Sequence, residues 1–318
     1  MRRRREYHRR SKKRGGCLKI FVLMLFIIIL IAGGLLFKLY RDAKSLSQNV
    51  FTEKPQTQQV ISDTSAKVSE VKPISILLLG IDTGEFGRIE QGRSDVIMVA
   101  TLNPKTKQTT LVSIPRDSYT KIIGHDTEDK INHAYAFGGK AMAVNTVQAL
   151  LDIPIDYTFS INMQGFEDIV DAVGGVTITP TSTFTQDGYE FNEGQPVQMN
   201  GAMALAYTRN RADAEGDYGR QGRQRQLLQA IAQAALSLNL VAKYQEILQT
   251  LNGNLSTDMP FAEMIKIMQK YGDVLQSLNT IQLSGTGELR DDIYYEMLDK
   301  TQLSEVITQL KAQLELNE

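Results

Sequence analysis

Apolar residues occur along the chain in runs of different length, and the longest run lies near the N-terminus. Residues 20–37 contain no charged side chain. As a helix they would extend about 27 Å, at ~1.5 Å per residue, which is close to the ~30 Å hydrocarbon core of a bilayer. Together with the flanking apolar residues, this pattern predicts a single N-terminal transmembrane helix over residues 20–39.

Shorter apolar runs predict the strands of a sheet from residue 73 onwards. Residues 74–80 (ISILLLG) are almost entirely apolar, which is typical of a strand buried on both faces. Residues 95–102 and 109–114 are two more such runs, and the turn sequence at 103–107 predicts that they pair as a hairpin. Further strands are predicted at 155–161, 176–179 and 281–283.

Between these strands, apolar residues recur at helical spacing. The longest amphipathic segment is 220–238, in which Leu227, Leu228 and Ile231 share one face. Other helices are predicted at 139–151, 164–173, 200–207, 241–252, 260–278 and 301–315. Because strands and helices interleave, the predicted fold class is α/β, with a mixed central β-sheet flanked by helices. We expect the α/β domain to span residues 73–240, with a helical extension over 241–318 packed on it.

The charge distribution indicates how the chain is oriented. Residues 1–19 contain ten Lys and Arg residues and one acidic residue, although the whole chain has a formal net charge of −1. A basic run of this kind is compatible with nucleic-acid binding, but directly before a transmembrane helix it favours a cytoplasmic N-terminus. A cleaved signal peptide is the alternative interpretation, and the absence of a small-x-small cleavage site after the run disfavours it.

We therefore expect a basic cytoplasmic tail at 1–19, a single pass through the cell membrane, a polar stalk at 40–72 and a folded domain on the extracellular side. Nucleic acid is not expected as a partner. The only cysteine, Cys17, precedes the apolar run, so the domain has to be stable without an intramolecular disulfide. The three histidines, His8, His125 and His133, do not form a recognisable metal or nucleophile motif, and the chain has neither a Walker loop nor a GxGxxG sequence.

The stretch 207–226 (YTRNRADAEGDYGRQGRQRQ) has the most informative pattern of charges. It contains five arginines: Arg209, Arg211, Arg220, Arg223 and Arg225. Arg220 and Gln224 are four residues apart at the start of the long helix, on a face that runs towards its apolar stripe, and Asp217 is a candidate cap. A helix N-terminus combined with guanidinium groups favours anion binding, phosphate above all. The alternative is a solvated charged face, in which the arginines pair with Asp213, Glu215 and Asp217.

Two aspartates are predicted to meet at one end of the sheet. Asp95 opens one strand of the predicted hairpin and Asp117 follows the other, and the start of one strand lies opposite the end of the next. Two carboxylates there are able to hold Mg²⁺, which binds through one or two carboxylates together with substrate phosphates. Alternatively, each aspartate pairs with Arg93 or Arg116, and the pattern alone does not decide between the two.

Several segments together resemble the LytR-CpsA-Psr family of Gram-positive cell-wall enzymes. In chain order they are LLLGID (77–82), GRSDVIMVATLNPKTKQTTLVSIPRD (92–117), KINHAYAFGG (130–139), GFEDIVDAVGGV (165–176), NGAMALAYTRNR (200–211) and GDYGRQGRQRQ (216–226). The resemblance covers roughly residues 74–240, and the set of motifs is highly specific.

The resemblance implies a membrane-anchored phosphotransferase. Such enzymes move an anionic glycopolymer, of the wall teichoic acid or capsular polysaccharide class, from an undecaprenyl-diphosphate carrier to a peptidoglycan hydroxyl. It implies Mg²⁺ as cofactor, and a hydrophobic channel for the lipid. By position, Asp95 and Asp117 match the metal-side aspartates, Arg209, Arg211 and Arg220 match the diphosphate-binding arginines, and Gln224 matches a nearby glutamine. The remaining substrate-binding candidates are Arg93, Arg116, Lys130 and Arg223.

The chain departs from the family pattern at a few positions. Ser94 stands where the family usually has Thr, His133 replaces a small residue, and the short loop before Gly216 leaves the placement of Arg211 open. Two other functions remain as alternatives: a pyrophosphatase that acts on the same lipid donor, and a non-enzymatic polyprenyl-phosphate sensor or transcription attenuator.

Overall fold

The structure is a computed structural model that describes residues 68–82, 92–210, 216–237, 250–251, 253–276 and 278–316. The predicted tail and transmembrane helix, most of the predicted stalk, Arg211 and nearly all of the predicted helix 241–252 lie outside the described residues. Among the helices that are described, none combines the length and the apolar character that crossing a membrane requires.

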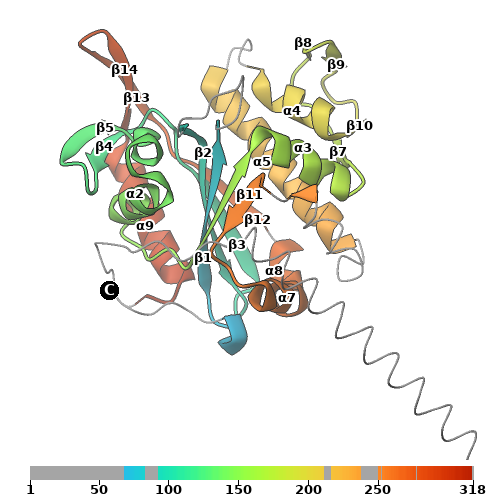
Figure 1. Cartoon of the computed structure of the whole chain (residues 1–318), viewed down its shortest axis with the longest axis horizontal. Coiled ribbons are helices and arrows are strands. Elements are labelled where there is room, and N and C mark those ends of the chain that lie inside the picture. The colour runs from blue at the N-terminus through green and yellow to red at the C-terminus, as the bar shows by residue number, and fades with distance from the viewer. Residues whose placement is uncertain are drawn as a thin grey trace, which may run out of the picture. The chain divides into compact units, whose positions relative to one another are not determined.

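A six-stranded mixed sheet forms the centre of the fold, with the strand order β11-β6-β1-β2-β3-β12 (Figure 1). The strands are β1 (Ile74–Ile81), β2 (Ser94–Asn103), β3 (Gln108–Ser113), β6 (Tyr157–Asn162), β11 (Leu255–Thr257) and β12 (Leu278–Gln282). β1, β2 and β3 pair in antiparallel fashion, whereas β6 joins β1 and β12 joins β3 in parallel. The prediction of a mixed α/β sheet is therefore confirmed.

Both faces of this sheet are covered, which explains why its strands read as continuous apolar runs. Leu77 and Leu79 point into one core, which α2 (His133–Leu151) and α9 (Lys300–Gln313) help to build. Ile74 and Ile76 point into the opposite core, built with α7 (Phe261–Lys270), α8 (Gly272–Gln276) and α5 (Gly216–Ser237). Alternate residues of a strand face opposite sides, so an apolar residue is needed at nearly every position.

A third core joins α3 (Met163–Ala172), α4 (Gly201–Arg209) and α5 beside the sheet. Asn162 and Asn200 cap α3 and α4 by accepting hydrogen bonds from the backbone of Gly165 and Met203. The remaining elements are short: η1 (Val68–Glu70), β4 (Tyr119–Ile122), β5 (Thr127–Lys130), β7 (Val176–Ile178), β8 (Phe184–Gln186), β9 (Tyr189–Phe191), β10 (Val197–Met199), β13 (Gly285–Arg290) and β14 (Ile293–Leu298).

The region after residue 240 differs from the expected helical extension. Both edge strands of the central sheet, β11 and β12, come from it, and β13 and β14 form a separate antiparallel hairpin. The helix predicted at 260–278 is divided into α7 and α8, and the chain enters β12 at Leu278. These strands are short and partly exposed, so the hydrophobic pattern that identifies buried strands is weak in them.

Gly201 allows α3 and α4 to pack closely, because a Cβ built there would lie 2.4 Å from the carbonyl oxygen of Glu167. We predict that Gly201→Ala lowers the free energy of unfolding by about 1–3 kcal/mol, as expected for an overpacked contact. Gly222 is the matched control: a Cβ at this position in α5 has Arg225 Nη2 as its nearest neighbour, at 3.8 Å. Gly222→Ala is expected to raise the free energy of unfolding by about 0.5–1 kcal/mol, through helix propensity.

Chemical denaturation of the two variants and the parent chain measures both effects. Equal stabilities of the two variants would contradict the assignment of close packing to Gly201.

Candidate active site

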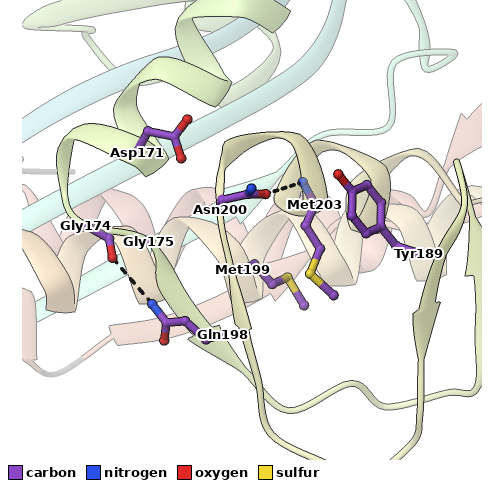
Figure 2. Close-up of a pocket in the computed structure, with 8 residues that line it drawn as sticks. All are labelled: Asp171, Gly174, Gly175, Tyr189, Gln198, Met199, Asn200 and Met203. Carbon is purple, nitrogen blue, oxygen red and sulfur yellow. Dashed lines mark hydrogen bonds between the residues drawn. The ribbon is translucent and has the colours of Figure 1, made fainter.

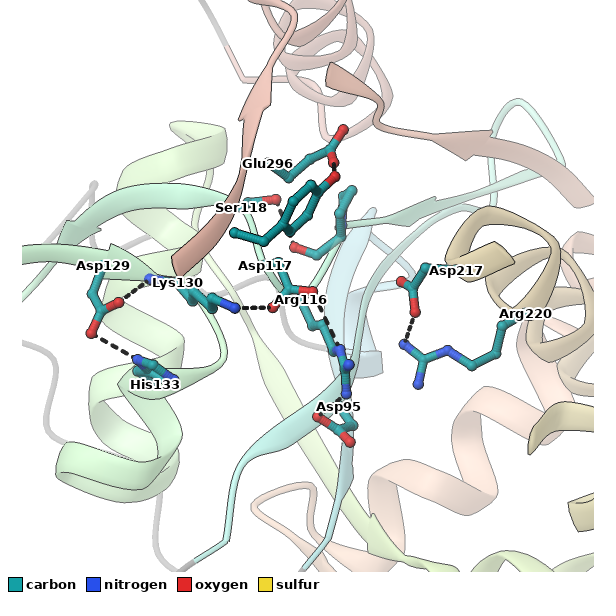
Figure 3. Close-up of polar contacts among 12 residues, drawn as sticks. Asp95, Arg116, Asp117, Ser118, Asp129, Lys130, His133, Asp217, Arg220 and Glu296 are labelled. Carbon is teal, nitrogen blue, oxygen red and sulfur yellow. Dashed lines mark hydrogen bonds and ion pairs between the residues drawn. The ribbon is translucent and has the colours of Figure 1, made fainter. Parts of the chain in front are cut away.

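The paired strands β2 and β3 bring Asp95 and Asp117 together, and one arginine lies between them (Figure 3). Arg116 Nη1 is 3.0 Å from Asp95 Oδ1, and Arg116 Nε is 3.5 Å from Asp117 Oδ2. The pairing that produces this arrangement continues to the end of the strands, where the Ile114 amide donates to the Ile97 carbonyl. The structure thus shows the arginine-paired arrangement of the two aspartates that the sequence left open.

Arg116 lies in a strongly acidic environment. Its side chain is 21% exposed, and this burial lowers its pKa, but the charges of Asp95, Asp117 and Asp217 outweigh burial and hold the pKa above its usual value. Arg116 therefore remains a cation at any physiological pH. Figure 3 shows Asp217, in the first turn of α5, on the side of Arg116 towards Arg220.

Lys130, at the end of β5, provides a second cation for Asp117. Its Nζ is 2.9 Å from Asp117 Oδ1 and 5.7 Å from the ring centre of Tyr295. The neighbouring Asp129 contacts His133 Nδ1 at 2.7 Å. Partial burial raises the pKa of Asp129, but the hydrogen bonds from His133 and from the Lys130 amide outweigh it and hold the pKa below its usual value. His133 thus packs at the edge of this cluster through Asp129.

The first turn of α5 places Arg220 in a buried position on the opposite side of the cluster (Figure 3). Arg220 is only 5% exposed, and its Nη2 lies 2.6 Å from Asp217 Oδ1. Asp217 is itself inside the helix and also accepts a hydrogen bond from Gln221, so the predicted cap is an ion-pair partner instead. The N-terminus of α5 adds a partial positive charge to that of Arg220, so this turn favours an anion.

The other predicted residues have different surroundings. The Gln224 side-chain oxygen is buried and accepts no hydrogen bond from the described residues, and its assignment to the substrate stays a prediction. Arg223 donates to the Asn210 carbonyl at 2.6 Å and stacks on Phe184, which ties α5 to the end of α4. A role of Arg223 in packing accounts for both contacts.

Arg209 and Arg93 are exposed. Arg209 contacts Asp187 (3.8 Å), in the turn between β8 and β9, and Met163 (3.1 Å). The Arg93 amide donates to Asp82 at 2.5 Å, which joins the ends of β1 and β2. These contacts do not place either residue beside the paired aspartates, so their assignment to the substrate stays a prediction.

Two residues near the cluster were not identified from the sequence. The Glu296 amide, in β14, donates to the Asp117 carbonyl at 2.9 Å, and the Tyr218 hydroxyl donates to the Glu296 carboxylate. Both residues depend on the long-range pairing of β14 with the segment after β3, which no local pattern specifies. The turn residues Asp291 and Asp292, both with positive φ, were the only local signal of this hairpin.

The aspartate pair also fits the predicted Mg²⁺. The Arg116 guanidinium lies between carboxylate oxygens of Asp95 and Asp117, and its positive charge stands in for that of a metal ion at this place. Among the described residues, no group of three or more acidic, histidine or cysteine side chains forms a complete metal site. The arrangement therefore suits an ion held by two carboxylates and by phosphate oxygens from a ligand, which is typical of Mg²⁺.

A cavity of about 310 Å³ lies elsewhere, between the end of α3 and the start of α4 (Figure 2). The Asp171 carboxylate at its edge accepts a hydrogen bond from the Gly201 amide (2.7 Å), and the Asn200 side chain caps α4. These polar groups hold α3 against α4, and none of the predicted site residues lines the cavity. The hydrophobic lipid channel stays a prediction, because this cavity is not lined by the predicted site residues.

The chain is similar to several curated proteins over most of its length. A transferase of Enterococcus faecalis, named polyisoprenyl-teichoic acid–peptidoglycan teichoic acid transferase TagU, is 46% identical over 284 residues, which covers 88% of this chain and 91% of that one. The Bacillus subtilis protein of the same name is 39% identical over 284 residues, with 89% and 91% covered.

Several solved structures superpose on this chain. A crystal structure from E. faecalis, described as a transcriptional regulator, superposes with a TM-score of 0.72 at 42% identity and covers 80% of this chain and 92% of its own. A structure described as TagT bound to LI-WTA superposes with a TM-score of 0.69 at 31% identity, with 83% and 99% covered. The model of the LytR_cpsA_psr family matches residues 35–312, and the chain therefore belongs to this family.

Proposed function

We propose that this protein transfers an anionic glycopolymer of the wall teichoic acid class from a polyprenyl-diphosphate carrier to a hydroxyl group of peptidoglycan. The observation that carries the proposal is the facing arrangement of Arg116 and Lys130, paired with Asp95 and Asp117, and Arg220 at the N-terminus of α5. The names of relatives at 39–46% identity support the substrate class.

The charges of the site suggest how a diphosphate binds. Three cations, Arg116, Lys130 and Arg220, are each paired with a carboxylate of the site. A bound diphosphate offers these cations phosphate oxygens in place of carboxylates, and the guanidinium forks suit such oxygens bidentately. Before a ligand binds, these three cations are paired with Asp95, Asp117 and Asp217, and the same cations are the groups that a diphosphate would contact.

In the reaction, a peptidoglycan hydroxyl oxygen attacks the phosphorus atom that carries the glycan. The bond from this phosphorus to the bridging oxygen breaks, and polyprenyl phosphate leaves with the electron pair. Arg220 and the helix N-terminus stabilise the charge that develops on the leaving phosphate, and a carboxylate of the site accepts the hydroxyl proton. Catalysis then depends on positioning and electrostatics, as in other phosphoryl transfers.

Mg²⁺ belongs to the same proposal. Asp95 and Asp117 would hold it, and it would supply positive charge to the phosphate oxygens and leave Arg116 and Lys130 to contact phosphate. The predicted membrane anchor fits as well, since it would hold the domain on the extracellular side of the cell membrane, near a lipid-linked donor.

Replacement of Arg220 tests the function directly. We predict that Arg220→Ala lowers the rate of transfer by about 10²–10³, the size usually found when one donor to a developing charge is removed. Arg220→Lys should recover only part of this loss, since an ammonium keeps the charge but not the planar fork. Mass spectrometry of the products from a synthetic polyprenyl-diphosphate glycan and peptidoglycan oligomers measures the rates.

Lys107→Ala is the control for this experiment, because Lys107 lies in the exposed turn at the far end of the β2–β3 hairpin, where it pairs with Asp273. It should transfer at the parental rate. A rate for Arg220→Ala within threefold of that control, with an unchanged thermal melt, would count against the assigned site.

Metal removal tests the role of the two aspartates. We expect chelation to stop transfer and added Mg²⁺ to restore it, with Asp95→Asn requiring at least about tenfold more Mg²⁺, because one of two anionic ligands is lost. Mn²⁺ binding, followed by electron paramagnetic resonance, gives a readout independent of transfer. Asp273→Asn is the matched control, since Asp273 is an exposed aspartate outside the site. Full activity after chelation would contradict this part of the proposal.

A further inference from the structure

The hairpin of β13 and β14 is fixed directly onto the aspartate cluster. The Glu296 amide donates to the Asp117 carbonyl at 2.9 Å, and the backbones of Glu296 and Ser118 pair in an isolated parallel β-bridge. Figure 3 shows Glu296 beside Asp117 and Ser118. Side chains on this part of the hairpin therefore have defined positions relative to the candidate active site.

Glu296 is a buried carboxylate, only 5% exposed, with both oxygens used. The Tyr218 hydroxyl, from the first turn of α5, donates to Oε1, and the Tyr294 hydroxyl donates to Oε2 at 2.6 Å. Tyr218 also accepts a hydrogen bond from the Gly285 amide, 3.2 Å away in β13. Burial, followed by the hydrogen bond to Glu296, raises the pKa of Tyr218 to about 12, so this donor keeps its proton at physiological pH.

Gly287 makes room for the ring of Tyr294. A Cβ built on Gly287 would lie 2.6 Å from Tyr294 Cε2, 2.9 Å from its hydroxyl oxygen and 3.1 Å from the Cζ atom between them, so the Cε2–hydroxyl edge of the ring lies against the glycine. Tyr294 is nevertheless 46% exposed. Two contacts therefore fix the ring, the glycine at its edge and Glu296 at its hydroxyl, and much of the side chain remains open to a ligand.

The exposed ring of Tyr294 lies on the hairpin face that adjoins the site. Tyr294 and Glu296 are two residues apart in β14, so they lie on the same face of the hairpin, the face turned to α5 through Tyr218. The hydrogen bond to Glu296 is the main cause that raises the pKa of Tyr294. The backbone of Glu296, two residues further along β14, is itself bonded to Asp117. Leu289, opposite Tyr294 in the register and 69% exposed, extends the apolar surface on this face.

We propose that the exposed ring of Tyr294 binds a pyranose ring of the glycan substrate by stacking, with Gly287 and Glu296 as its positioning residues. The proposal rests on the proposed function of the site. A pyranose ring has C–H groups on its faces and hydroxyl groups at its edge, so an aromatic face with polar neighbours matches it. A ring fixed before binding loses little conformational entropy when the sugar arrives. The sugar belongs either to the lipid-linked donor or to the peptidoglycan acceptor, and experiment separates the two.

A binding measurement tests this without any transfer. The chain contains no tryptophan, so Tyr294→Trp in the full chain, purified in detergent, has a single indole fluorophore. We expect saturable changes of its emission with one of two probes, a soluble peptidoglycan oligomer or a short-chain polyprenyl-diphosphate glycan, and the probe that responds identifies the source of the sugar. Ile293→Trp is the matched control, because Ile293 is 48% exposed but lies on the opposite hairpin face. Equal responses of the two variants, or none with either probe, would overturn the proposal.

Kinetics of transfer provide the second test. Tyr294→Ala should raise KM for the stacked substrate by about tenfold, the scale of one aromatic contact, with kcat changed less than threefold. Tyr294→Phe should keep KM within threefold, because the ring remains beside Gly287, whereas Gly287→Ala should raise KM by displacing the ring. Ile293→Ala serves as control. If Tyr294→Ala and Ile293→Ala have the same KM for both substrates, the stacking role is wrong. A parental chain without transfer activity would instead contradict the proposed function and leave the fluorescence result standing.

Discussion

The candidate site depends on one guanidinium group shared between two carboxylates. The antiparallel register of β2 and β3 places Asp95 and Asp117 at the same end of the sheet, where two like charges repel each other. Arg116, between them, removes this repulsion, and Lys130 provides a further positive charge to Asp117. The same pairing that makes the sheet end stable leaves a cation and two carboxylates where a diphosphate and a metal ion have complementary partners.

Three separate parts of the chain have to meet for this site to form. The sheet provides the aspartates, the first turn of α5 provides Arg220, and the β13–β14 hairpin provides Glu296, to which Tyr218 of α5 donates a hydrogen bond. Tyr218 therefore links the hairpin to the helix that carries Arg220, and the Glu296 amide links it to Asp117. A displacement of any one part changes the distance between the groups that would bind the two ends of a diphosphate.

The sequence predicted those parts of the fold that depend on local pattern. The buried strands β1, β2 and β3 and the helix α5 follow from apolar periodicity, and the convergence of Asp95 with Asp117 follows from the geometry of a hairpin. The edge strands β11 and β12 were not recognised, or only in part, because they are short and have exposed residues that weaken the pattern. The partners of Glu296, among them Tyr218 and the Asp117 carbonyl, depend on contacts between distant segments, which residue spacing does not encode.

Product analysis in water enriched in ¹⁸O tests the central claim most directly, that the acceptor of the phosphoryl group is a sugar hydroxyl. With a polyprenyl-diphosphate glycan and peptidoglycan oligomers as substrates, the account predicts a phosphodiester-linked glycan–peptidoglycan product without ¹⁸O, together with polyprenyl phosphate. A free phosphorylated glycan that carries ¹⁸O, formed at the same rate without peptidoglycan, would contradict the account and identify a pyrophosphatase.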